Sequence, residues 1–414
     1  MNKEWKLVRL GDYISIKSGL AYQGSKIGMG DSYLLGMGCV SFKDKFVDSG
    51  ARLYDGSNVD NSYYVSPGDI VLATRQQSDN LPILAMPAII PDTFANKKVI
   101  YGTNLYKVDN NSCISNGFLF WLLKHQHYVN YIAGVKSGTA VQMVTKKNVE
   151  NYKFFCPPQE SREKIADILW SYDELIENNN KRIAILEQMA ENLYKEWFVR
   201  FRFPGHETAE FENGIPKDWE YVKLGDVLSF ERGISYSSEE IDCDEGLNLI
   251  NLKNIEAFGG FRRDGIKKYN GKYKDTQVVK TGDLILGVTD MTQDRRTVGA
   301  VALIPTLYGT SVISADLVKV ISDIPNYYLY CLCRYGFYSK YFSQFANGAN
   351  VLHLKPNTLL NKKLLLPKRE LVDSFTEKVT DIISLIDKLN LNNDNLTKQR
   401  DLLLPRLMSG KLEV

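Results

Sequence analysis

The chain has 414 residues, of which 44% are hydrophobic and 24% charged, with a formal net charge of +2. This length exceeds what one compact core usually organises, so we expect two or more domains. The longest dense apolar stretch is FLFWLL at 118–123, which excludes a membrane-spanning helix, since one needs roughly 18 consecutive apolar residues. The polar start MNKEWK lacks the apolar region of a signal peptide, so a cytoplasmic protein is expected.

Charge is distributed unevenly along the chain. Residues 1–157 carry 17 Lys and Arg against 12 Asp and Glu, and residues 201–370 carry 22 against 21. The shorter segments are acidic: residues 158–200 carry 6 Lys and Arg against 9 Asp and Glu, and residues 371–414 carry 6 against 7. This pattern permits DNA binding on selected faces of the long segments without requiring it.

Cysteine and histidine usage gives no sign of a metal site. The 6 cysteines form no CxxC pair, so we expect reduced and mostly buried thiols. His125 and His127 would face one metal ion only on a strand, whereas the surrounding FLFWLLKHQHYVNYI predicts a helix. We therefore predict no metal ligand.

The sequence repeats itself. WKLVRLGD at 5–12 returns as WEYVKLGD at 219–226, and PGDIVL at 67–72 returns as TGDLIL at 281–286. Later anchors keep the same order while their offset falls from 214 to 210. The two copies share mainly apolar residues, Gly and Pro, which form cores and turns. We therefore expect an α+β protein with two tandem similar recognition domains of mixed β structure and short helices.

Each copy ends in a long helical pattern whose apolar residues recur at spacings of 4 and 3, the seam of a coiled coil. Residues 160–200 would form a helix of about 60 Å, which is too long to pack as a separate amphipathic helix on one small domain. We expect the two helices to pair as an antiparallel coiled coil, with the domains related by an approximate two-fold axis. The predicted seam consists of Ile165, Leu169, Tyr172, Ile176, Asn179, Ile183, Leu186 and Leu193 in the first helix and Val379, Ile382, Ile386, Leu389, Asn393 and Leu396 in the second.

Each seam contains one Asn, and Asn179 and Asn393 lie 214 positions apart, the repeat distance itself. A buried Asn in a seam can fix the register of two helices at some cost in stability. An Asn can also mark a frayed or locally exposed turn, so the sequence leaves both interpretations open.

The chain accordingly divides into five segments. We predict a first recognition domain at 1–157, a spacer helix at 158–200, a linker rich in Pro and Gly at 201–218, a second recognition domain at 219–370, and a spacer helix with a tail at 371–414.

Catalytic signatures are missing from the sequence. GFRRDGIK at 260–267 has the glycine spacing of a phosphate-binding loop but places Ile266 where the Lys must stand. The single Pro-Pro pair, in CPPQ at 156–159, lacks the Asn or Asp and the aromatic residue of an amino-methyltransferase motif. GxSxG and HExxH motifs do not occur. We predict no catalytic residue.

Taken together, these motifs resemble the specificity subunit of a Type I restriction-modification system. The resemblance rests on W-x-x-V-x-L-G-D at the start of each half, PGD before an apolar run, and KSGTAVQMV at 136–144. It also rests on PPQESREKIADIL leading into the first long helix and on TKQRDLLLPRLMSGKLEV at 397–414. It spans nearly the whole chain.

The resemblance implies a non-catalytic subunit that reads one part of a split, asymmetric double-stranded DNA target with each recognition domain. It implies that the helices set the gap between these parts and dock two modification subunits, which carry S-adenosylmethionine and methylate adenine at N6 after flipping it out of the duplex. Restriction subunits, which use ATP and Mg²⁺, would join the same assembly, and no cofactor is expected in this chain itself. Two other hypotheses remain: a free-standing DNA-binding regulator, and a DNA-modifying enzyme with an unrecognised site.

Base reading requires donors and acceptors on exposed loops, with Arg favouring guanine and Asn or Gln favouring adenine. The polar loops at 73–84 and 287–298 differ between the copies, and each copy also has a polar segment around a shared glycine. Any single member of these loops could instead be a solvated surface residue. The candidates are Arg75, Gln76, Gln77, Ser78, Asn80, Lys136, Ser137, Thr139 and Gln142 in the first copy and Thr289, Gln293, Arg295, Arg296, Asn347, Asn350, His353 and Lys355 in the second.

Two further assignments concern individual residues. Lys136 and Lys355 are expected to contact phosphates, which position a protein on DNA without specifying sequence. Trp5 and Trp219 belong to the shared scaffold, so we predict that they pack in the cores rather than stack on bases.

Overall fold

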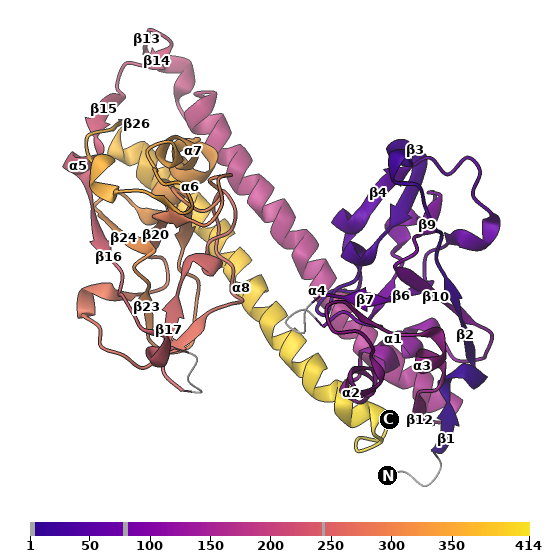
Figure 1. The fold of residues 1–414 in the computed structure, drawn as a ribbon. Coiled ribbons are helices and arrows are strands. Elements are labelled where there is room, and N and C mark those ends of the chain that lie inside the picture. The colour runs from indigo at the N-terminus through magenta and orange to yellow at the C-terminus, as the bar shows by residue number, and fades with distance from the viewer. Residues whose placement is uncertain (1–4, 78–81, 242–244) are drawn as a thin grey trace. The chain divides into compact units, whose positions relative to one another are not determined.

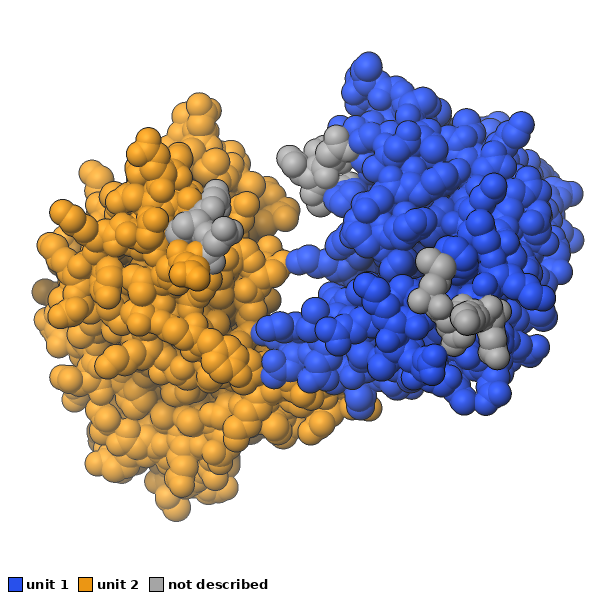
Figure 2. Space-filling view, turned by 90° about the horizontal axis from the view of Figure 1, so that it is seen from below, with its two compact units in different colours: residues 1–177, 394–414 blue, residues 178–393 orange. Residues whose placement is uncertain are grey.

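The computed structural model describes residues 5–77, 82–241 and 245–414 (Figure 1). The chain forms two compact units, one of Met1–Glu177 with Asp394–Val414 and the other of Asn178–Asn393 (Figure 2). The boundary cuts both long helices. Each unit therefore contains one mixed α and β domain, part of the helix that follows it in the chain, and part of the other long helix.

In the first unit, strands form two sheets of four and two smaller pairs. The orders are β2-β10-β6-β8, β4-β3-β9-β5, β1-β12 and β7-β11, and β3 with β9 is a parallel pair. The strands are β1 (Lys6–Arg9), β2 (Ile14–Ser18), β3 (Ile27–Leu35), β4 (Ala51–Tyr54), β5 (Tyr64–Val65), β6 (Ile70–Ala73), β7 (Arg75–Gln76), β8 (Pro87–Ile89), β9 (Val99–Tyr101), β10 (Leu105–Asn110), β11 (Gln142–Met143) and β12 (Lys153–Cys156).

The second unit repeats this arrangement strand for strand, with orders β16-β24-β20-β22, β18-β17-β23-β19, β15-β26 and β21-β25. Its parallel pair, β17 with β23, corresponds to β3 with β9. The strands are β15 (Glu220–Lys223), β16 (Leu228–Arg232), β17 (Leu247–Ile250), β18 (Lys267–Tyr269), β19 (Val278–Val279), β20 (Leu284–Gly287), β21 (Thr289–Asp290), β22 (Val301–Leu303), β23 (Ser311–Ile313), β24 (Leu317–Ser322), β25 (Leu352–His353) and β26 (Lys363–Leu366).

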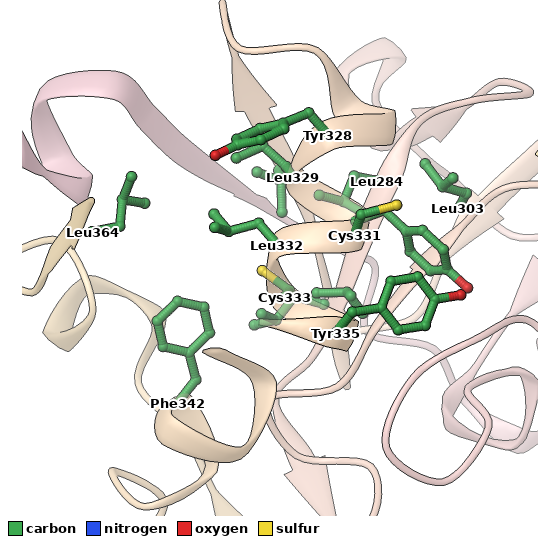
Figure 3. Packing of buried hydrophobic residues seen from close by; sticks show 14 of the residues in the cluster. Leu284, Leu303, Tyr328, Leu329, Cys331, Leu332, Cys333, Tyr335, Phe342 and Leu364 are labelled. Carbon is green, nitrogen blue, oxygen red and sulfur yellow. The ribbon is translucent and has the colours of Figure 1, made fainter. Parts of the chain in front are cut away.

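Short helices cover one sheet in each unit. Ser115 caps the first of them by accepting a hydrogen bond from the N–H of Phe118, and the six residues that follow Gly117 are all buried. In the second unit, Tyr328, Leu329 and Leu332 pack among buried strand residues (Figure 3). The helices are α1 (Asn116–Lys124), α2 (Gln126–Val135), α3 (Lys146–Glu150), α4 (Gln159–Tyr194), α5 (Leu224–Val227), α6 (Asn326–Tyr335), α7 (Tyr338–Ser343) and α8 (Arg369–Met408).

The repeated octapeptide frames each domain. Its strand, β1 or β15, pairs antiparallel with the last strand of the same domain, β12 or β26. Leu10 and Leu224 in the two copies are buried. Trp5 and Trp219 are half-buried and pack against the hydrophobic cores, as predicted for scaffold residues.

The segment between α4 and the second domain is folded onto the second unit. A wide turn at Lys195–Val199 ends α4 and buries Trp197 and Phe198. Further on, the ring of Phe203 lies 5.8 Å from that of Trp219. A short hairpin of β13 (Phe211–Glu212) and β14 (Ile215–Pro216) follows. The Pro and Gly content of this segment thus marks turns rather than an extended tether.

The helices α4 and α8 pack together as antiparallel partners. In the first unit, the Asp173 carboxylate of α4 lies 2.5 Å from the Arg400 guanidinium, near the end of α8. In the second unit, the ring of Tyr194, at the end of α4, lies 6.0 Å from the ring of Phe375, near the start of α8. As the residue in α4 advances from Asp173 to Tyr194, its partner in α8 moves back from Arg400 to Phe375. The helices therefore run in opposite directions, which confirms the predicted pairing. Of the fourteen predicted seam residues, all are buried or half-buried.

The seam asparagines bond to each other across the second unit. Asn179 Nδ2 donates to Asn393 Oδ1 over 2.8 Å, and Asn393 Nδ2 donates to Asn180 Oδ1 over 2.9 Å. Asn179 is buried and Asn393 half-buried. This arrangement favours the register interpretation over a frayed turn. If one helix shifted along the other, the amides would separate and both hydrogen bonds would be lost.

In the described ranges, no helix has both the length and the apolar character that crossing a membrane would require.

Candidate nucleic-acid interface

In each unit, the structure joins the two polar segments that differ between the copies. β7, at the start of the loop after the PGD strand, pairs with β11 from the glycine-centred segment, with Gln76 opposite Gln142. In the second unit, β21 pairs with β25, with Thr289 opposite His353. We call β7, β11 and the turn at 137–143 the first ribbon, and β21, β25 and the turn at 347–353 the second ribbon.

The ribbons share one register although their polar residues differ. In the first, the N–H of Met143 donates to the Ser137 carbonyl over 2.8 Å. In the second, the N–H of His353 donates to the Asn347 carbonyl over 2.9 Å. Both acceptors and both donors are related by the offset of 210 residues found in the sequence. The duplication has thus preserved the backbone of the ribbon and changed its side chains.

A glycine is required at the same place in each turn. Gly138 has φ +94° and Gly348 has φ +152°, a backbone region that residues with a Cβ rarely adopt. A Cβ would lie 2.2 Å from the Val141 carbonyl oxygen at the first position and 1.9 Å from the Val351 carbonyl oxygen at the second. The tight turn therefore cannot form with any other residue unless its backbone shifts.

Gln76 supports the first ribbon from inside. This side chain is buried, and its Oε1 accepts hydrogen bonds from the N–H groups of Ile83 and Leu84 over 3.1 and 3.0 Å. Its Nε2 donates to Gln142 Oε1 over 2.6 Å, and Lys136 Nζ donates to the same oxygen over 3.0 Å. The prediction that Gln76 faces outward does not match this position, because the alternation of strand β7 points Arg75 to solvent and Gln76 into the domain.

Asp290 performs the corresponding task in the second ribbon, and sequence reasoning missed it. It stands at the position of Gln76 and is buried, and its carboxylate accepts from the N–H groups of Thr292 over 2.8 Å and Thr297 over 2.7 Å. Burial by itself would raise the pKa of Asp290, but these hydrogen bonds outweigh it and lower the pKa below its ordinary value. The Asp-x-Thr order, which is typical of a turn closed by a carboxylate, could have identified it.

The predicted residues differ in how they are placed. Thr289 is also buried, where its Oγ1 donates to Asp316 Oδ1 over 3.0 Å, so its predicted outward position is likewise not observed. Ser78 and Asn80 lie outside the described residues. Lys136, Gln142 and Arg295 are half-buried, and the exposed candidates are Arg75, Gln77, Ser137, Thr139, Gln293, Arg296, Asn347, Asn350, His353 and Lys355.

The loop after β21 contacts the second ribbon through one side chain, whereas its two arginine side chains bind groups outside the ribbon. Gln293 Nε2 donates to the Ala349 carbonyl in the ribbon turn over 2.8 Å. Arg295 instead donates to the Ser343 carbonyl over 2.7 Å, and Arg296 pairs with Asp294 over 2.7 Å. In this conformation the two arginines lie beside α7, not in the ribbon.

A groove of about 870 Å³ lies beside the second ribbon. Thr289, His353 and Lys355 line it, together with polar residues that the sequence analysis did not select. Asn357, Thr358 and Asn361 lie within six residues after Lys355, which could have pointed to them, whereas no such signal marks Arg232. The additional polar lining residues are Arg232, Asn357, Thr358 and Asn361, all exposed.

The histidines of α1 and α2 have a packing role. The rings of His125 and His127 stack at 6.5 Å, and His127 Nδ1 lies 3.0 Å from the Tyr152 hydroxyl. Burial, followed by the charge of His127, lowers the pKa of His125 to about 4. Within the described residues, no group of three or more His, Cys, Asp or Glu is placed to hold a metal ion.

Comparison with known proteins gives one consistent answer. A family model described as the Type I restriction modification DNA specificity domain matches residues 2–188. The chain is 26% identical to the specificity subunit of the Type I restriction enzyme MjaVIII from Methanocaldococcus jannaschii, over 78% of this chain and 76% of that one. The chain is thus similar to Type I specificity subunits over most of its length.

Two further proteins are similar to the chain, one in sequence and one in structure. The HindI specificity subunit of Haemophilus influenzae is 24% identical over 73% of this chain and 79% of its own length. The crystal structure of the Type I S subunit from M. genitalium superposes with a TM-score of 0.59, covering 99% of this chain and 97% of that one at 13% identity. At this identity, the second comparison establishes a shared fold.

Proposed function

We propose that this chain is a specificity subunit that reads a split DNA target, one part with the first ribbon and the other with the second. The observation that supports this is the shared register of the ribbons combined with their different exposed side chains. The same backbone pairing presents exposed Ser137 and Met143 in one copy and exposed Asn347 and His353 in the other. Two copies of one scaffold would then read two different sequences. The recognition domains are assigned to 1–157 and 219–370.

Each exposed side chain has a proposed role that follows from its chemistry. Arg75 would bind guanine, and Gln77, Asn347 and Asn350 would bind adenine. Lys355, in the groove beside the second ribbon, would contact a phosphate. Gln76, Asp290 and Thr289 would act indirectly by holding the ribbons in shape, since their polar atoms already bond within the domain.

The paired helices would set the distance between the two target parts and dock two modification subunits. Several large apolar side chains of α4 and α8 face solvent instead of the seam, and such residues on a helix are suited to bind partner helices. They are Leu175, Ile185, Met189, Leu385 and Leu402. The modification subunits would bring S-adenosylmethionine for adenine methylation, and restriction subunits would bring ATP and Mg²⁺.

The test is to reconstitute the chain with its modification subunits and map the methylated adenines. The proposal predicts a bipartite target whose second part alone changes when residues 219–366 are exchanged for another such domain. Removing one heptad from both helices should shorten the gap and leave both sequences intact. If both sequences changed in either variant, the proposal would be wrong.

The same preparation separates the alternatives. Tight binding of the bipartite site by the chain alone would indicate a free-standing regulator, and turnover of DNA by the chain alone would indicate an enzyme. The proposed function requires weak binding alone and specific, salt-sensitive binding in the complex.

A further inference from the structure

A second hollow in the second unit lies beside α7. It has a volume of about 510 Å³ and is formed by the loop at Phe258, the loop that follows β21, and the residues around α7. Val298 and Ala300 form an apolar part of its wall, and Arg295 and Lys340 bring positive charge to its lining. None of these residues forms the second ribbon, so the hollow is a separate feature, which we call the α7 pocket.

The backbone around the α7 pocket is strained. Phe258, Arg295 and Phe337 have φ values of +68°, +54° and +65°, in the left-handed region that side chains other than Gly rarely adopt. All three line the pocket. Such strain persists only where the surroundings impose it, and it concentrates at binding sites. Here the N–H of Phe258 donates to the Arg296 carbonyl over 2.7 Å, which holds two of the pocket loops together.

The strain exposes two aromatic rings instead of burying them. Phe258 is 62% and Phe337 is 67% exposed, and both belong to the pocket lining. An exposed Phe gains nothing from the hydrophobic effect until another molecule covers it. Aromatic residues next to Arg are typical of the centre of a protein interface.

The charged groups that line the α7 pocket do not balance one another. Ser339 is only 6% exposed, yet its Oγ has no hydrogen-bond partner among the described residues. Asp294, the acidic residue of the lining, pairs with Arg296. In the described part of the chain, neither Arg295 nor Lys340 has a carboxylate within ion-pair distance. The pocket therefore has a surplus of positive charge, which a ligand with carboxylates would neutralise.

The lining of the α7 pocket belongs to the second copy alone. At the positions 210 residues earlier, the first copy has His127, Val129 and Asn130 in place of Phe337, Ser339 and Lys340. A feature that served both halves equally would be expected in both copies. The pocket thus suits a partner that binds once per chain.

We propose that the α7 pocket binds an acidic segment of a partner protein, with an apolar side chain against Phe258 and Phe337 and carboxylates toward Arg295 and Lys340. A DNA backbone is disfavoured because phosphates need cations but not exposed aromatic rings and an apolar wall. This inference goes beyond DNA reading and does not depend on it.

The experiment is a selection from a random-peptide display library on the full chain, with counter-selection on Arg295→Ala/Lys340→Ala. We expect enriched peptides that combine Asp or Glu with an aromatic or large aliphatic residue. Their affinity should fall about 10-fold in the double variant, as for other charged interface residues. Lys340→Glu, at an exposed position, should weaken binding further without affecting the fold. Lys272→Ala/Lys280→Ala, two exposed cations outside the pocket, is the matched control.

Three outcomes would overturn the proposal. The selected peptides could lack enriched Asp and Glu, or bind the double variant and Lys340→Glu as well as they bind the native chain. Alternatively, the double variant could leave peptide binding intact and lower the salt dependence of duplex DNA binding by the assembled complex, which would make the pocket a phosphate contact. Loss of peptide binding with unchanged methylation targets would support the pocket and leave the DNA-reading proposal standing.

Discussion

The two units hold their long helices with carboxylates at different positions of the repeat. At the offset of 210 residues that relates the starts of α4 and α8, Asp173 corresponds to Ile383, and Asp387 corresponds to Glu177. In the first unit, Asp173 pairs with Arg400 of the partner helix, both being mostly buried. In the second unit, Asp387 pairs instead with Arg263 of the domain and accepts from the N–H of Thr306. Asp173 therefore joins helix to helix, whereas Asp387 joins helix to domain, as its counterpart Glu177 does by pairing with Lys45 in the first unit.

The ribbons differ at a position that does correspond between the two units. A neutral amide, Gln76, closes the loop of the first, and a carboxylate, Asp290, closes the loop of the second. A duplicated scaffold thus conserves the backbone geometry that a side chain must support, while the supporting group itself is free to change. Four substitutions test how the two units are stabilised and how their ribbons are supported.

Arg400→Ala should have the largest effect. It leaves the Asp173 carboxylate buried without its cation, which typically costs about 4 kcal/mol. We expect a loss of this order in the free energy of unfolding, measured by urea denaturation. Lys398→Ala, an exposed neighbour on the same helix, is the control. An equal effect of the two substitutions would show that Asp173 and Arg400 do not hold the helices together.

Gly348→Ala should come next, because a Cβ would lie 1.9 Å from the Val351 oxygen. Strain of this kind costs about 3 kcal/mol, and it should abolish recognition of the second target part. Gly138→Ala should do the same for the first part. Methylation mapping of the assembled complex measures both effects. Gly36→Ala is the control, since a Cβ there meets no atom within 4 Å.

Asp290→Asn should destabilise the chain by about 2 kcal/mol, the usual contribution of hydrogen bonds to a charged group. Because the folded pKa of Asp290 is lowered, its stabilisation is fully present above the ordinary value of 3.8 and is lost as the pH falls through the folded pKa. Thermal unfolding between neutral and acidic pH should therefore show a smaller acid dependence in Asp290→Asn than in the native chain. Gln76→Ala should show the native acid dependence, since an amide does not titrate.

Lys355→Ala should have the smallest effect. Loss of one phosphate contact reduces the slope of log affinity against log salt by about 0.9, with no change in target sequence. Salt titrations of DNA binding by the assembled complex measure this slope. Lys272→Ala, at an exposed position outside the groove, should leave it unchanged. An altered target sequence in Lys355→Ala would assign this residue to base reading instead.

Features with a repeating pattern could be predicted from the sequence. The seam of α4 and α8 extends over many turns, so its spacing reveals the buried face. The glycines of the ribbon turns could be found because both copies retain them. Asn179 and Asn393 left two interpretations open because the sequence does not show which residue stands opposite each of them.

The orientation of the ribbon side chains could not be predicted, because the strands are too short to show a pattern of alternating apolar and polar residues. In a strand of two residues, such as Arg75–Gln76, no apolar alternation indicates which side chain faces the core. Asp290 was missed for a related reason. A buried carboxylate and an exposed one look alike in a sequence, and the difference lies in backbone N–H groups that only the folded loop brings together.

The pairing of β1 with β12 and of β15 with β26 has one further consequence. Each domain begins and ends on neighbouring strands, so the chain enters and leaves it at one place. At the other end of the sequence, Gly410 lies against the ring of Trp5, since a Cβ added to it would be 3.2 Å from that ring. A circularly permuted gene that starts in the segment before Trp219 and joins residue 414 to residue 1 would preserve every strand pair described above. The strand pairing of the fold therefore does not require the two halves to follow one another in the order found in this sequence.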